Sequence, residues 1–107
     1  MKKVTLDISH RLHLLSVFNE FKGGIALVVD IQDAVRDMQL SEKEIKDWNF
    51  VVADNRYTWN EKKAQEKEVE LKDTVVEYVL QYIKDKDERG EFTLQDSIVL
   101  SLKEKLE

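Results

Sequence analysis

The chain contains 107 residues, with 22 Asp and Glu against 17 Lys and Arg, and it has neither Cys nor Pro. This length predicts one domain over residues 1–107, and the 42% hydrophobic fraction excludes a disordered tail. The lack of Cys excludes disulfides, thiolate zinc sites and cysteine nucleophiles. No apolar run approaches about 20 residues and no signal-peptide pattern is present, so we expect a cytoplasmic protein without a membrane segment.

Alternating apolar residues near the start predict a short strand over residues 4–8, because successive strand side chains point to opposite faces. A helix is expected from Ser9, and Gly23-Gly24 ends it, since glycine readily adopts the left-handed conformation found at helix ends. A second helix is expected over residues 25–39. The apolar residues at helical spacing in these two helices are Leu12, Leu15, Phe18 and Phe21, then Val28, Ile31, Val35 and Met38.

A capping box marks the start of a third, short helix. The Ser41 hydroxyl can accept a hydrogen bond from the backbone of Glu44, whose carboxylate can reach back to the Ser41 backbone. We expect this helix to end near Trp48.

Two β-rich runs then flank Asp54-Asn55, and both turn residues tolerate positive φ. This pattern predicts a hairpin over residues 49–60 with a two-residue turn. Its cross-strand pairs on one face are Val52 with Tyr57 and Phe50 with Trp59.

Residues 61–67 are polar and are expected to form a loop before a second alternating strand over residues 68–71. Both alternating strands lead into helices, so we expect them to share one small sheet. The segment from Thr74 to Glu77 has a capping-box pattern, which predicts a helix that continues through Ile83.

After Gly90, a last helix is expected from Thr93. Its leucine and isoleucine residues recur every four positions, so each lags the previous one by about 40° around the helix. Part of such a stripe can cover the preceding helix, and the remainder has no obvious partner within the chain. This remainder predicts a symmetric dimer or another partner contact. The stripe consists of Leu94, Ile98, Leu102 and Leu106.

These elements together predict an α+β domain that is mostly helical, with about five helices, a β-hairpin and short strands. An all-α domain that carries a hairpin is the alternative.

Several segments, taken in order and with their spacing, resemble a group of short, uncharacterised proteins encoded by bacteriophages and prophages. The resemblance extends over about residues 4–106 and implies a phage-derived protein in the cytoplasm of a bacterial host. It implies no assigned activity and no catalytic residues. The segments are RLHLL at 11–15, LSEKEIK at 40–46, WNF at 48–50, TWN at 58–60, EKEVEL at 66–71 and LSLKEKL at 100–106.

Three residues at the start of the first helix are weak candidates for a metal site. Asp7, His10 and His13 are spaced so that both histidines share one side of a helix, and a carboxylate could complete the ligand set. The favoured interpretation is that these are ordinary polar residues beside leucines. Nucleophile-elbow, phosphate-loop and H-E-x-x-H motifs are missing, so no cofactor and no enzymatic activity are expected.

Tyr57 and Trp59 are the main candidates for contact with a partner, provided that the face of the hairpin is open, and Leu102 and Leu106 are the others. The sequence therefore predicts a non-catalytic protein that binds itself or another protein. One alternative is a nucleic-acid-associated accessory protein, which the acidic balance opposes. The other is a small metalloenzyme that uses His10 and His13.

Overall fold

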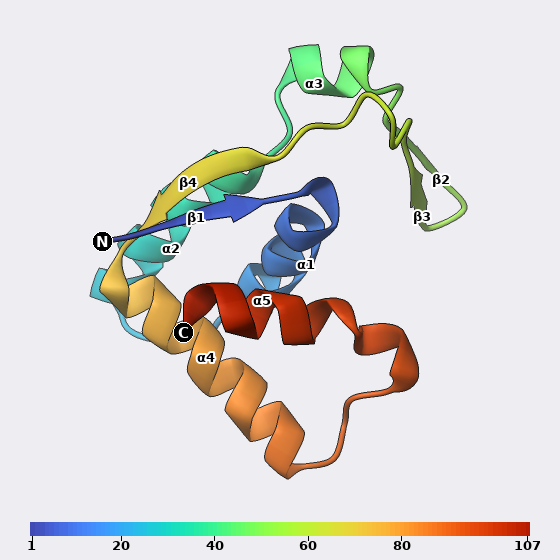
Figure 1. Cartoon of the computed structure of the whole chain (residues 1–107). Helices are drawn as coiled ribbons and strands as arrows, with labels where there is room; N and C mark the ends of the chain where they lie inside the picture. The colour runs from blue at the N-terminus through green and yellow to red at the C-terminus, as the bar shows by residue number, and fades with distance from the viewer.

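A computed structural model describes residues 1–107, with the exception of the Gln95 side chain. Figure 1 shows helices around one small sheet, with a second small sheet set to one side. The α+β class is therefore confirmed, and the all-α alternative is wrong. The elements are β1 (Lys2–Leu6), α1 (Ile8–Asn19), α2 (Ile25–Met38), α3 (Glu42–Asp47), β2 (Val51–Ala53), β3 (Arg56–Thr58), β4 (Lys67–Leu71), α4 (Asp73–Glu88), the 3₁₀ helix η1 (Leu94–Asp96) and α5 (Ile98–Leu106).

The central sheet joins the two alternating strands, as expected. β1 and β4 pair antiparallel, with Lys2 opposite Leu71 and Leu6 opposite Lys67. The period-2 pattern places the apolar side chains on one face, where they are buried, with Lys2 and Lys67 half-buried at its ends. The exposed face carries Lys3, Thr5, Glu68 and Glu70. The buried face supports the hydrophobic core.

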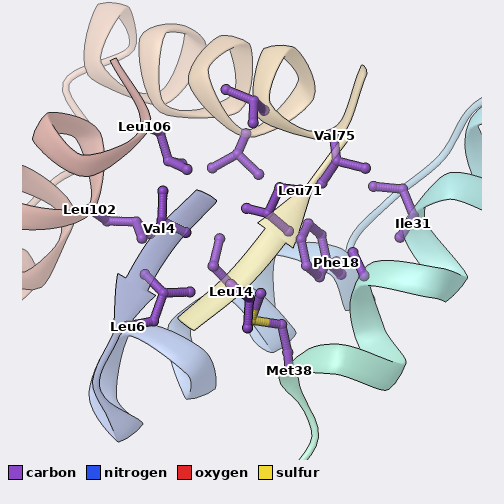
Figure 2. Close-up of a cluster of buried hydrophobic side chains, with 14 of the residues drawn as sticks. Val4, Leu6, Leu14, Phe18, Ile31, Met38, Leu71, Val75, Leu102 and Leu106 are labelled. Atoms are coloured by element: carbon purple, nitrogen blue, oxygen red, sulfur yellow. The ribbon is translucent and has the colours of Figure 1, made fainter. Parts of the chain in front are cut away.

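Side chains from α1, α2, α4 and α5 meet on the buried face of this sheet (Figure 2). Leu14 and Phe18 come from α1, and Met38 comes from the end of α2. The last helix, α5, contacts β1, α1 and α4. The core is thus a single cluster in which the small sheet is covered by helices drawn from both ends of the chain.

The first strand and helix meet one residue earlier than expected. Ile8 is the first residue of α1 and not the end of the strand, because Asp7 is the N-cap residue. The Asp7 carboxylate accepts from the backbone of His10 at 2.8 Å, and the backbone N–H of Asp7 donates to the His10 ring. This capping box ends β1 at Leu6.

α4 also begins earlier than the capping-box pattern from Thr74 to Glu77 predicts. The helix begins at Asp73, and the Thr74 hydroxyl donates to Asp30 on α2 at 2.8 Å instead of capping its own helix. α4 continues past Ile83 to Glu88, and Gly90 follows with a φ of 64°. A tertiary hydrogen bond therefore replaces the local capping box that the sequence pattern indicated.

The sequence predicts that the last helix begins at Thr93, but the helix begins later. The Asp96 carboxylate accepts from the Thr93 backbone at 2.8 Å and closes the short η1 turn, after which α5 starts at Ile98. Because a separate 3₁₀ turn comes first, Leu94 does not lie on the same helix as Leu102.

Residues 41–66, which we call the arm, project from the side of the domain (Figure 1). The arm contains α3, the hairpin formed by β2 and β3, and the segment that leads to β4. The two-residue turn is confirmed, because Asp54 and Asn55 have φ values of 51° and 61°. Every residue of β2 and β3 is exposed, so no helix covers either face of this hairpin.

Candidate interaction surfaces

The histidine cluster at the start of α1 has a structural role. His10 is buried, its Nδ1 accepts from the Asp7 backbone, and its Nε2 lies 2.9 Å from the Ser101 hydroxyl on α5. Because Nδ1 accepts, the hydrogen-bond network assigns the proton to Nε2, which donates to Ser101. Burial lowers the pKa of His10 and favours this neutral form.

His13 does not join His10 in a ligand set. It is half-buried, and burial lowers its pKa as well. Within the described part of the chain, no group of three or more His, Cys, Asp or Glu side chains is disposed to hold a metal ion. Asp7 and His10 instead cap α1 and fasten it to α5.

Leu102 and Leu106 are core residues, which corrects the expectation that they face a partner. Leu102 is 0% exposed and Leu106 is 2% exposed, because α5 packs on β1 and α1 as well as on α4. The preceding helix, α4, is only one of the neighbours of α5, and β1 and α1 cover the rest of its apolar stripe. The exposed apolar surface is elsewhere, at Leu94 of the stripe and at Leu100 outside it, which are 98% and 68% exposed.

These two exposed leucines border a cleft of about 680 Å³ between α4 and α5. Its apolar wall includes Leu80, Ile83 and Phe92, and Lys84 and Asp87 contribute charges of both signs. The cleft is the first exposed apolar surface of the molecule.

The hairpin carries the second exposed apolar surface, which we call the aromatic face. The Phe50 ring stacks on Tyr57 at 5.6 Å and on Trp59 at 6.4 Å, with 20° between the planes in both cases. The predicted cross-strand pairing of Phe50 with Trp59 is therefore confirmed as ring stacking. Tyr57 is 54% exposed, whereas Phe50 and Trp59 are half-buried, so Tyr57 is the open part of this face.

One buried arginine attaches the arm to the domain. Arg11 is 0% exposed, its Nε donates to the Met38 carbonyl at 3.1 Å, and its Nη2 donates to the Gln39 carbonyl at 2.8 Å. The same guanidinium holds both carboxylate oxygens of Glu44 on α3, at 2.8 and 3.1 Å. Arg11 thus binds the carboxyl end of α2 and the first turn of α3 together.

Glu44 has a second task, because it also closes the predicted capping box. The backbone of Ser41 donates to Glu44 at 2.9 Å, and the Glu44 backbone donates to the Ser41 hydroxyl at 3.1 Å. The hydrogen bonds from Arg11 lower the pKa of Glu44 to about 2, with the Ser41 backbone as a further cause. The capping box is confirmed, and Arg11 is the partner that sequence reasoning missed.

A signal for Arg11 was present in the sequence. It follows Ile8 by three positions and precedes Leu14 by three, so it lies on the apolar stripe of α1. A cation on such a stripe requires a partner, because an unpaired buried charge is very costly. The identity of that partner depends on the fold.

No protein-family model, curated protein or solved structure matches this chain. The resemblance to bacteriophage proteins accordingly stays a prediction. Over the described residues, no helix is both long enough and apolar enough to cross a membrane.

Proposed function

We propose that this protein is a non-catalytic protein-binding module and that the aromatic face of the arm contacts its partner. The observation that carries this proposal is the stack of Phe50, Tyr57 and Trp59, in which Tyr57 is 54% exposed, on a hairpin whose two strands are exposed throughout. Tyr and Trp are enriched where a few residues supply most of the binding energy of an interface.

The attachment of the arm supports the same role. The stacked rings lie across the two sides of the hairpin, and the Arg11–Glu44 ion pair anchors α3, which precedes the hairpin in the arm. A surface that is already ordered loses less conformational entropy on binding, which favours affinity.

The cellular location and the kind of partner that we propose rest on the resemblance to bacteriophage and prophage proteins. We propose a phage-type protein in the cytoplasm of a bacterial host, with a host or phage protein as its partner. The charge distribution favours a protein over a nucleic acid, because Lys62 and Lys63 on the arm stand beside Glu61 and near Glu66 instead of forming a basic groove.

A photo-crosslinking amino acid placed at Tyr57 tests the proposal in bacterial cells that produce the protein. We expect one defined crosslinked protein, with an adduct that is lost when Trp59 is replaced by Ser. The matched control carries the same crosslinker at Leu94, which is also exposed but lies outside the arm. Equal yields of the same adduct from both positions, or no adduct from position 57, would contradict the proposal.

A further inference from the structure

The outer edge of β2 is an unprotected strand edge. The hairpin sheet contains only β2 and β3 among the described residues, so one side of each strand is unpaired. β2 consists of Val51, Val52 and Ala53, all exposed, with Val52 at 61%. In Figure 1, β2 forms the side of the hairpin that faces away from the domain.

The central sheet offers a contrast within the same molecule. The exposed positions of β1 and β4 include Lys3, Glu68 and Glu70, and charged side chains on a strand discourage pairing with another chain. β3 carries Arg56. β2 has no charge and two β-branched residues, so it lacks the usual protection against pairing.

The register of the hairpin identifies the free backbone groups. Ala53 and Arg56 flank the two-residue turn and exchange hydrogen bonds with each other, so the next pair, Val52 and Tyr57, does not. The N–H and C=O of Val52 consequently point away from β3, toward the free edge. Those of Val51 and Ala53 point inward.

We infer that a second copy of this chain pairs with β2 along this edge, antiparallel, about a two-fold axis at Val52. With only Val52 presenting outward groups, self-pairing must be centred there so that the two Val52 residues exchange both hydrogen bonds. Val51 of each copy then lies opposite Ala53 of the other. In this register no like charges lie opposite each other. Two-fold self-pairing of β1 or of β4 would instead bring together strands rich in Lys and Glu.

The area of the interface and the net charge of each copy determine how tightly the two copies associate. Two strands of three residues each bury much less than the roughly 1,200 Å² of a stable interface, so the dimer is weak and concentration-dependent. Each copy has a net charge of −5, and salt screens the repulsion between copies. Added salt therefore strengthens the dimer. This pairing goes beyond the proposed function, because it uses the backbone edge and leaves the aromatic face free.

Sedimentation velocity up to about 1 mM protein, at low and high salt, measures the association directly. The decisive variants place charges at positions 51 and 53, which lie opposite each other in the two copies. Val51→Lys with Ala53→Lys sets lysines opposite each other across the axis, and Val51→Glu with Ala53→Glu does the same with glutamates. We expect each double variant alone to raise the dissociation constant about tenfold, and a 1:1 mixture of the two to form a heterodimer.

Near-UV circular dichroism of the stacked rings reports whether the hairpin remains folded in each variant. Val52→Pro is the second test, because it removes the outward N–H and no N–H that bonds within the hairpin, and it should abolish the dimer while the ring signal persists. A wild-type chain that stays monomeric over the whole range overturns the inference, and so does a mixture that does not associate. The crosslink at Tyr57 is a separate readout, so this inference and the proposed function fail independently.

Discussion

The domain core and the arm are stabilised in different ways. The core joins apolar side chains from two strands and four helices in one buried cluster, and among the described residues none of its members belongs to the arm. The arm has one buried aromatic residue, Trp48, a partly exposed ring stack and the link to Arg11. Stability therefore resides in the core, whereas the arm offers surface and opens at a lower free energy.

The largest effect is expected from a cavity in the core. Leu102→Ala should lower the free energy of unfolding by about 4 kcal/mol, because Leu102 is fully buried. Leu100→Ala, on the exposed side of the same helix, should change it by less than about 0.5 kcal/mol. Urea unfolding measures both. Equal losses in the two variants would show that α5 does not bury the face described here.

Removal of the arginine tests how the arm is attached. Arg11→Met should cost about 3 kcal/mol, because Glu44 and two carbonyl groups lose their partner. Hydrogen exchange should accelerate most in residues 41–66. The control Arg36→Met removes a highly exposed arginine paired with Asp33 and should leave exchange in the arm unchanged. Uniform acceleration over the whole chain would refute a separate attachment.

Acid should weaken the same link. The pKa of Glu44 is lowered from 4.5 to about 2, so its stabilising contribution is complete above pH 4.5 and is lost as the pH falls toward 2. We expect a loss of about 3 kcal/mol from this group, because one pKa unit corresponds to about 1.4 kcal/mol. Urea unfolding at several pH values should show this loss in the wild type and not in Glu44→Gln. An identical acid slope in both proteins would assign the loss to other groups.

A smaller effect is expected at the start of α3. Ser41→Ala removes the hydroxyl that accepts from the Glu44 backbone and should cost about 1 kcal/mol. Ser16→Ala, at an exposed position of α1, serves as the control and should be nearly neutral. A neutral Ser41→Ala would mean that Arg11 alone orders the first turn of α3.

The smallest effect on stability is expected on the aromatic face. Tyr57→Ser should change the free energy of unfolding by less than about 1 kcal/mol, because the ring is more than half exposed. Partner binding, measured by the crosslinking assay with the crosslinker moved to Val52, which lies on the same face of the hairpin as Tyr57, should nevertheless be lost. A large loss of stability in this variant would place Tyr57 in a core and remove the basis of the proposed function.

Interactions between near neighbours could be predicted from the sequence alone. The alternation that defines β1 and β4, the turn at Asp54-Asn55 and the Ser41–Glu44 capping box all depend on residues a few positions apart. Each of these features is specified by backbone geometry and short-range hydrogen bonding, which are the same in any fold. The α+β class follows from them.

Only the tertiary structure decided which surfaces are covered. Arg11 finds Glu44 33 residues away, Thr74 bonds to Asp30 instead of capping its helix, and Leu102 is buried against β1 from the opposite end of the chain. The open face of the hairpin was undecided for the same reason, since exposure depends on the path of distant segments. Burial depends on how the elements pack and not on local sequence patterns. The fold as a whole therefore determined that the aromatic face and the edge of β2 are exposed.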